Sequence, residues 1–204
     1  MDSCFVENDG SRGKGFLHLI MGPMYSGKST SLISKFNELK DLYKEKVVVV
    51  THEIENRYSL EKLSSHDRVE IDCKKVADIQ SIVNLCNSTT DNDVKFANCI
   101  LVDEVQFFPD LHRILDLVEL HSKTVYVYGL DGDFKRNKFG NILDLIPLCD
   151  TVTKLRGNCE YCEKKSLFSW RKTTDKETQV VVGAVDKYVP LCRKCYLKYS
   201  QQNV

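Results

Sequence analysis

The first three quarters of the chain repeat one pattern, in which a short apolar run is followed by a stretch with helical spacing. The runs at residues 16–21 and 47–51 are almost wholly apolar, interrupted only by His18 and Thr51, which predicts buried β-strands. Between them, apolar residues recur at every third or fourth position from Lys28 to about Tyr43, which predicts an amphipathic helix. The chain therefore begins as strand, loop, helix, strand.

The same alternation continues further along the chain. Apolar runs predict strands at 69–71, 99–104 and 124–130, and helical spacing predicts helices over 76–86 and 111–118. Strands that alternate with helices predict an α/β fold, with a mostly parallel sheet flanked by helices on both faces.

After Leu155 helical periodicity stops, and two cysteine pairs bracket the segments SLFSW and QVVVGAV, which are candidate strands. We therefore divide the chain into a flexible N-terminal arm (1–15), an α/β domain (16–153) and a small C-terminal domain (154–204). A unit of some 50 residues is too small to rely on its own apolar core and needs a staple such as a metal.

The segment GPMYSGKS fits the phosphate-loop pattern G-x-x-x-x-G-K-[ST] at every fixed position, and it lies between a predicted strand and a predicted helix. Its backbone N–H groups and the helix N-terminus can bind phosphate oxygens. Lys28 adds a positive charge, and the Ser29 hydroxyl can bind Mg²⁺. A chance glycine turn would not explain all of these positions. The fold is therefore of the P-loop NTPase type.

Two carboxylates, Asp103 and Glu104, follow the apolar run CILV. A carboxylate at this place in a P-loop protein is expected to hold Mg²⁺, which we assign to Asp103 together with Ser29. Glu104 is the candidate general base. The base could activate water, as in an ATPase, or an acceptor hydroxyl, as in a kinase, and the pair alone leaves both open.

The pairs Cys159-x-x-Cys162 and Cys192-x-x-Cys195 are 29 residues apart. Two tight turns with two thiolates each can complete a tetrahedral zinc site, and four cysteine ligands leave no open position, so the zinc is expected to be structural. The other five cysteines stand singly and are expected to be free or core thiols. They are Cys4, Cys73, Cys86, Cys99 and Cys149.

Charge is balanced overall, with 29 basic and 29 acidic residues, but uneven along the chain. From Lys154 onward, eleven Lys and Arg face five Asp and Glu. Together with the aromatic and basic residues of LFSWRK, this keeps a nucleic-acid-binding zinc module as an alternative. No apolar run is long enough for a membrane span, and the polar N-terminus lacks a secretory h-region, which favours a cytoplasmic protein.

The segment QVVVGAVDKYVPLC is apolar, contains glycine and ends at a zinc ligand, so it could close over a small ligand. Phe134, soon after the predicted strand at 124–130, offers an aromatic surface, and Tyr188 lies in the loop itself. Each aromatic alone is more often a packing residue. Only in combination do they become candidates for binding a flat heterocycle.

Several motifs occur together and in order: GPMYSGKST, ENRYS, SHD, VDEVQFF, GLDGDFKRNKFG, GNCEYC and VGAVDKYVPLCRKC. In this arrangement the chain resembles the type II thymidine kinases over roughly residues 15–199. The resemblance implies transfer of the ATP γ-phosphoryl group to the 5′-hydroxyl of thymidine, and of deoxyuridine too, in pyrimidine deoxynucleotide salvage. It also implies a homotetramer that is inhibited by thymidine triphosphate and does not act on nucleic acid or membranes.

The resemblance also implies roles for particular residues. Glu104 would be the base. ATP would be bound by Gly22, Pro23, Met24, Tyr25, Ser26, Gly27, Lys28, Ser29, Glu55, Asn56, Arg57, Asp103 and Gln106. Thymidine would be bound by Phe134, Gln179, Val180, Val181, Val182, Gly183 and Tyr188, most of them in a lasso-like loop. Zinc would be held by Cys159, Cys162, Cys192 and Cys195.

The chain departs from the family pattern at two places. Glu55 stands where the family usually has Asp, which keeps the charge but changes its reach by one methylene. Cys195 stands where some members have His, and it still completes a tetrahedral set. A P-loop ATPase whose zinc unit engages another macromolecule remains the enzymatic alternative.

Overall fold

The computed structural model describes residues 15–44, 46–54, 62–64, 70–172 and 187–201. Its centre is a six-stranded sheet in the order β5-β2-β6-β7-β1-β8, and every pairing in it is parallel. The strands are β1 (Phe16–Met21), β2 (Val47–His52), β5 (Lys74–Val76), β6 (Cys99–Val102), β7 (Thr124–Gly129) and β8 (Thr151–Lys154). The predicted α/β fold with a mostly parallel sheet is confirmed.

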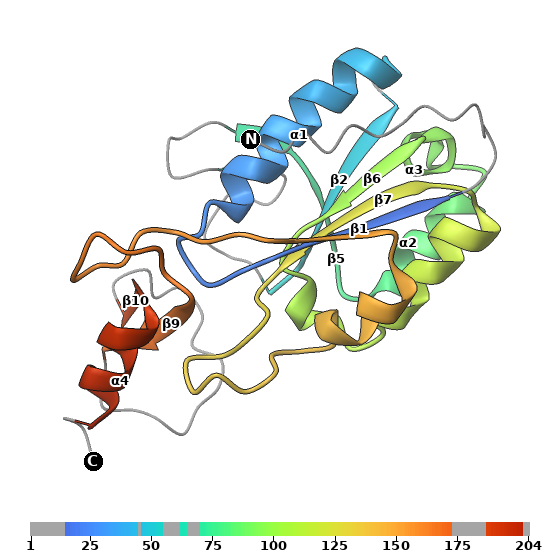
Figure 1. Ribbon diagram of the computed structural model, residues 1–204. Helices are drawn as coiled ribbons and strands as arrows, with labels where there is room; N and C mark the ends of the chain where they lie inside the picture. Colours follow the sequence, from blue (N-terminus) through green and yellow to red (C-terminus); the bar gives the residue numbers. More distant parts are fainter. Residues whose placement is uncertain (1–14, 45, 55–61, 65–69, 173–186, 202–204) are drawn as a thin grey trace.

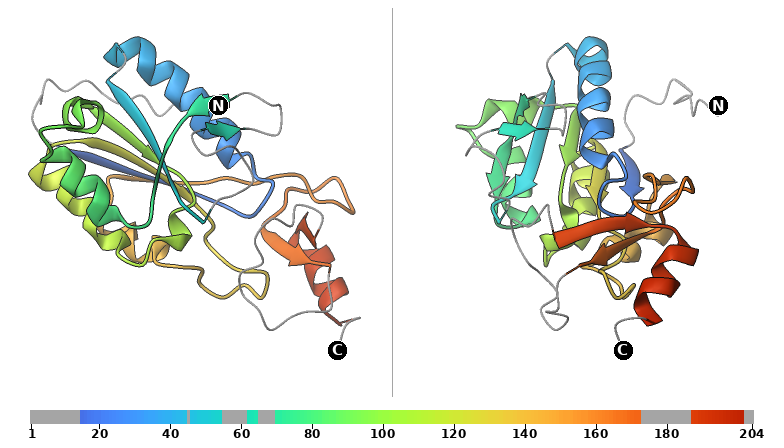
Figure 2. Two further views of the ribbon diagram at one scale, coloured as in Figure 1. Left: turned by 180° about the vertical axis from the view of Figure 1, so that it is seen from behind. Right: turned by 90° about the vertical axis from the view of Figure 1, so that its left-hand side faces the viewer.

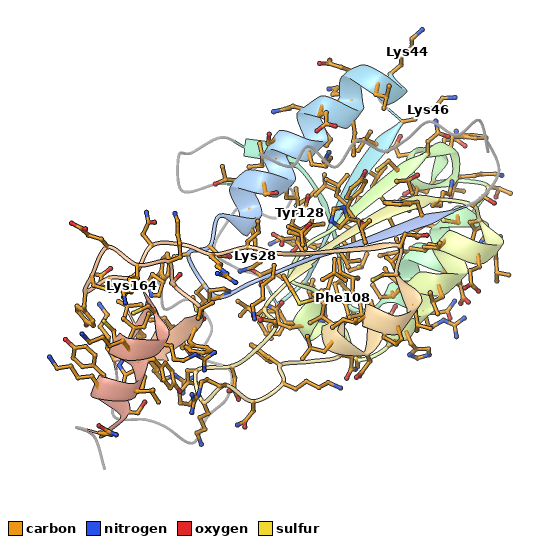
Figure 3. The ribbon with its side chains drawn as sticks, in the orientation of Figure 1. Lys28, Lys44, Lys46, Phe108, Tyr128 and Lys164 are labelled. Carbon is orange, nitrogen blue, oxygen red and sulfur yellow. The ribbon has the colours of Figure 1, made fainter. Side chains whose placement is uncertain are left out.

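Helices cover both faces of this sheet, as Figures 1 and 2 show. Helix α1 (Lys28–Tyr43) lies on one face, where Leu32 and Tyr128 belong to one apolar cluster. Helices α2 (Ile79–Cys86) and α3 (Asn92–Phe96) lie on the other face, where Phe108 belongs to a second cluster. Figure 3 marks Tyr128 and Phe108 on opposite sides of the strands. The sheet is thus buried between two cores, as its continuous apolar strands require.

Short helical segments complete this part of the chain. They are η1 (Val105–Phe107), η2 (Leu111–Arg113), η3 (Asp116–Leu120) and η4 (Ile142–Leu148). The helix predicted over 111–118 is in fact the 3₁₀ segment η2 followed by the π-helical η3. The backbone N–H of His121 donates to Asp116 O at 3.1 Å, five residues back, and this bond closes the wider turn.

Some predicted helix and strand boundaries are wrong, and two of them have a clear cause. The helix expected from Val76 begins at Ile79, because Asp78 caps it by accepting a hydrogen bond from Ser81 N at 2.7 Å, and Val76 ends β5 instead. The strand expected over 99–104 ends at Val102, which leaves both carboxylates in the turn that follows.

The C-terminal unit contains the antiparallel pair β9 (Phe168–Arg171) and β10 (Tyr188–Leu191), followed by α4 (Arg193–Gln201). It lies beside the end of the sheet at which β1 leads into the phosphate loop (Figure 1). A separate two-stranded sheet pairs β3 (Lys62–Ser64) with β4 (Glu70–Asp72). The predicted strand QVVVGAV lies outside the described residues. The domain boundary near 153 stays a prediction, and the large sheet itself continues to Lys154.

Candidate active site

The predicted phosphate loop connects β1 to α1, as its motif requires. Gly27 adopts φ +85°, the left-handed region that glycine enters without strain, and it caps α1. The Lys28 ammonium donates to Gly22 O at 3.2 Å and to Pro23 O at 2.9 Å, so the side chain folds back over the loop (Figure 3). The first turn of α1 contains no acidic residue. The loop therefore presents a cation and a helix N-terminus to an anion.

The C-terminal unit packs directly against this loop. The backbone N–H of Met24 donates to Ser169 Oγ of β9 at 2.9 Å. Gly157 approaches so closely that a Cβ there would lie 2.3 Å from Tyr25 O, and a Cβ on Gly22 would lie 2.6 Å from Leu155 O. These glycines are required because backbone meets backbone. The phosphate loop is thus shaped in part by residues more than 130 positions away.

Strand register places the two carboxylates at the same edge of the sheet as the phosphate loop. Met21 of β1 pairs with Gly129 of β7, and Val127 of β7 pairs with Val102 of β6. The residues after Met21 and Val102 therefore emerge at the carboxyl ends of their strands, where α/β proteins bind ligands. One strand, β7, separates them.

Asp103 and Glu104 are held differently. Asp103 is 4% exposed, and its backbone N–H donates to Val50 O at 2.8 Å. Glu104 is half-buried and adopts φ +54°, a left-handed conformation that costs a non-glycine residue energy. This turn departs from the strand, so the two consecutive carboxylates need not point to opposite faces.

Gln106 connects the candidate base to the next strand. Its Oε1 accepts from the Leu130 N–H at 3.0 Å, and its Nε2 donates to the Glu104 carboxylate. Because the Leu130 N–H can only donate, the amide orientation is fixed with its nitrogen toward Glu104. Gly140, at φ +61°, approaches so closely that a Cβ there would lie 2.3 Å from Gln106 O. The family resemblance implies that Gln106 binds ATP, and the structure adds this contact with Glu104.

Phe134 and Tyr188 are brought together by a residue that the sequence analysis did not select. The Arg171 guanidinium lies 3.8 Å from the centre of the Phe134 ring and 5.0 Å from that of Tyr188. It also donates from Nε to the Tyr188 hydroxyl at 2.9 Å. The alternation in LFSWR indicates only that Ser169 and Arg171 share a face, since residues two apart on a strand do so, and it does not name the partner of that face.

The segment LFSWRK is not an exposed nucleic-acid surface. Ser169 and Arg171 are buried, and Trp170 packs against Tyr196 of α4 with ring centres 5.2 Å apart. The mixture of aromatic and basic residues is explained by a strand with two packed faces. This leaves the basic excess of the C-terminal part as the remaining observation behind the nucleic-acid-binding alternative.

The four predicted zinc ligands converge. The sulfur atoms of Cys159, Cys162, Cys192 and Cys195 all lie within 4.8 Å of one another. Four sulfurs bound at about 2.3 Å in a tetrahedron are about 3.8 Å apart. The separations of 3.6 Å between Cys162 and Cys192 and 3.7 Å between Cys162 and Cys195 fit that arrangement.

The pKa values of the cysteine cluster are also compatible with a metal site, which needs thiolate ligands. Desolvation raises the pKa of Cys195 to about 12. Burial acts in the same direction on Cys159, but hydrogen bonds involving the backbone of Cys192 and Tyr161 and the neighbouring thiols outweigh it and lower the pKa of Cys159 to about 7. The Cys159 thiol is thus easier to ionise than an ordinary cysteine, and metal binding would release the protons that the cluster still holds.

The described single cysteines are free thiols, as expected. Burial raises the pKa of Cys73 to about 11 and that of Cys99 to about 12, so these thiols are unreactive parts of the core. Of the remaining predicted site residues, Glu55, Asn56, Arg57, Gln179, Val180, Val181, Val182 and Gly183 lie outside the described residues. None of the helices in the described ranges is long and apolar enough to cross a membrane.

Comparison with known proteins decides the family. The family model described as thymidine kinase matches residues 15–196. The chain belongs to the thymidine kinase family. It is 38% identical over 184 residues to the thymidine kinase of Oryza sativa subsp. japonica, covering 90% of this chain and 66% of the rice protein. It is 38% identical over 195 residues to thymidine kinase a of Arabidopsis thaliana, covering 95% of this chain and 79% of the Arabidopsis protein.

A viral relative matches along almost its whole length. The thymidine kinase of Rabbit fibroma virus (strain Kasza) is 38% identical over 182 residues, covering 89% of this chain and 96% of the viral protein. The residues that the family model matches include the phosphate loop, the paired carboxylates and the cysteine cluster.

Proposed function

We propose that this protein transfers the γ-phosphoryl group of ATP to the 5′-hydroxyl of thymidine, and of deoxyuridine. The observation that supports this most is the meeting of three parts at one edge of the sheet. The phosphate loop, the Glu104–Gln106 pair and the strand pair β9–β10 all lie there, linked by the bonds from Met24 to Ser169 and from Leu130 to Gln106. An ATPase would need the first two parts but not the aromatic residues Phe134 and Tyr188 that Arg171 of β9 contacts.

The phosphate loop would bind the donor. Lys28 already lies over the loop carbonyls, and ATP phosphates would draw its ammonium away from them toward the transferring group. Mg²⁺ suits the oxygen ligands that the Ser29 hydroxyl and the buried Asp103 carboxylate provide. When bound, the ion would neutralise charge on the phosphates.

Glu104 would remove the proton from the thymidine 5′-hydroxyl. A sugar hydroxyl is a poor nucleophile at neutral pH, so a carboxylate aimed at its proton assists the transfer. The Gln106 amide holds one carboxylate oxygen, Oε2. We assign the Glu104 carboxylate, held in this way, to the substrate hydroxyl.

The C-terminal unit would hold the nucleoside. We propose that Phe134 and Tyr188 contact it, together with the loop at 179–183, and that structural zinc at the four cysteines fixes the base of that loop. From family resemblance alone we also propose a cytoplasmic homotetramer, restrained by thymidine triphosphate.

The experiment incubates the protein with γ-labelled ATP, Mg²⁺ and a panel of nucleosides. We expect label in thymidine and deoxyuridine but not in purine nucleosides. Glu104→Gln keeps the shape and the contact with Gln106 but cannot take the proton. Its turnover should fall by about 10²–10⁴-fold with both substrate affinities nearly unchanged, because general-base assistance contributes about that much.

Glu119→Gln, on the exposed end of η3, is the matched control and should turn over like the parent. Label found only in free phosphate, whatever nucleoside is present, would favour the ATPase. A Glu104→Gln loss that appears wholly as weaker ATP binding would assign Glu104 to the metal site beside Asp103 instead.

A further inference from the structure

Strand β9 has two faces with different partners. Phe168 and Trp170 point toward α4 and the cysteine cluster, where both pack against Tyr196. Ser169 and Arg171 point the other way, toward the α/β domain: Ser169 accepts a hydrogen bond from the phosphate loop, and Arg171 stacks on Phe134. One face of the strand therefore packs within the C-terminal unit, and the other lies against the candidate active site.

Arg171 lies at the centre of that second face. It is 1% exposed, although arginine is almost never fully buried without partners. Its guanidinium covers the Phe134 ring at 3.8 Å, and the register of the strand pair places Tyr188 of β10 directly opposite it. One side chain thus contacts both aromatic residues that we assign to the nucleoside, one from each part of the protein.

The hydrogen bonds of Arg171 also decide what the Tyr188 hydroxyl can do. Both Nε and Nη2 of Arg171 donate to this oxygen, and a guanidinium has no acceptor with which to reverse the bond. A phenolic oxygen that accepts two hydrogen bonds has only its own proton left to give. In the part of the chain that the structure describes, no residue accepts that proton. The buried Tyr188 hydroxyl can therefore act toward a ligand only as a hydrogen-bond donor.

We propose that Arg171 is a positioning residue of the nucleoside site. It fixes the Phe134 ring by stacking, and it turns the Tyr188 hydroxyl into a pure donor, which gives its proton to an oxygen of the bound nucleoside. This inference rests on the proposed function. It adds a residue that selects for a ligand with an oxygen acceptor at this point and against one with an amino group there.

The test compares Arg171→Met, Tyr188→Phe and the double variant with the parent enzyme. Arg171→Met should raise the KM for thymidine by about 10–100-fold, since it removes charge-assisted hydrogen bonds and the stacking cation. Tyr188→Phe, which loses only the hydroxyl, should raise it by about 3–30-fold. The KM for ATP and the zinc content should stay at parental values. The double variant should lose less than the product of the two single losses, because the residues act through one contact.

Arg136→Met is the matched control. Arg136 also stacks on aromatic rings of the C-terminal unit, 4.7 Å from the centre of Tyr196, but it is exposed, and within the described part of the chain it makes no hydrogen bond or ring contact with Tyr188. It should leave the KM for thymidine unchanged. Arg171→Lys retains the charge but not the paired donors, and it should recover only part of the loss.

Several results would overturn the inference. An unchanged KM for thymidine in Tyr188→Phe would show that the nucleoside does not take the proton. If the fold-increases in the KM for thymidine of the two single variants multiply in full in the double variant, Arg171 and Tyr188 act independently. A rise in both KM values together with lost zinc would make Arg171 purely structural. If the parent itself labels no nucleoside, the proposed function fails first. If the parent phosphorylates thymidine and Arg171→Met has the parental KM for thymidine, this inference is refuted and the proposed function stands.

Discussion

Replacing Gly140 by alanine should disable the candidate base from a distance. Gly140 adopts φ +61°, and an added Cβ would lie 2.3 Å from Gln106 O and 2.7 Å from its Cα. Ordinary contacts of this kind begin near 3.4 Å, so the Gln106 backbone would have to move by about 1 Å. Gln106 holds the Glu104 carboxylate, and the shift would therefore be passed to the base.

The size of the effect follows from that displacement. A misplacement of about 1 Å in a reacting group costs about 10²-fold in rate, so kcat should fall by roughly that factor. A non-glycine residue in the left-handed region costs about 1–2 kcal/mol, and overpacking costs about 1–3 kcal/mol more. A loss of about 2–5 kcal/mol in unfolding free energy corresponds to a fall in Tm of about 4–20 °C for a chain of this size.

Steady-state phosphorylation of labelled thymidine and thermal unfolding would measure both effects. Gly132→Ala is the control from the same segment, because a Cβ there would meet its nearest atom, Asn137 O, at 3.3 Å, a contact that a slight shift relieves. We expect near-parental kcat in that variant. The KM for ATP should change less than kcat in Gly140→Ala, since the shift displaces Gln106 while the phosphate loop lies on another connection. A Gly140→Ala enzyme with parental kcat would refute the idea that Gln106 positions Glu104.

Two further predictions concern zinc and the cap of α2. Cys162→Ser should remove zinc and weaken thymidine binding far more than ATP binding, measured by metal analysis and calorimetry; near-parental thymidine affinity in a zinc-free variant would disprove this. Asp78→Ala should lower the unfolding free energy by about 0.5–2 kcal/mol at pH 7, while Asp78→Asn, which can still cap, should lower it less. The hydrogen bonds from the Ser81 side chain and backbone lower the pKa of Asp78 below 3.8. Its charged cap therefore stabilises the fold above that pH, and the difference between parent and Asp78→Ala should shrink as the pH falls through the lowered pKa; a difference that grows in acid would contradict the assignment.

The predictable parts of the molecule are those in which sequence neighbours are also structural neighbours. Strand β1, the phosphate loop and α1 begin and end where the pattern places them, because each depends on local periodicity and on one glycine. Within each cysteine pair one turn sets the spacing, and the convergence of the two pairs was predictable because four thiolates in two such pairs form a metal site. The end of β6 was placed two residues too late, since the left-handed turn at Glu104 leaves no mark in an apolar pattern.

The missed features depend on contacts between distant segments. β8 was not predicted, although its pairing with β1 completes the sheet. The partnership of Arg171 with Phe134 joins β9 to a loop 37 positions earlier, and no periodicity reports it. Ser169 and Gly157 were missed for the same reason, because their partners are in the phosphate loop. The local sequence pattern indicates helices and strands, whereas contacts between the α/β domain and the C-terminal unit can be identified only in the folded structure.

At Glu104 thermal stability and turnover make opposite demands on the residue, because the left-handed backbone disfavours glutamate while the proposed reaction needs its carboxylate. A glycine would relax the left-handed turn at φ +54°, and an asparagine would tolerate it better than glutamate does. A laboratory selection that rewards only survival at high temperature would therefore favour losing the very carboxylate that we assign to the chemistry. The position would be a poor choice for consensus stabilisation and a good one for making a robust, inactive form in which substrates could be trapped together.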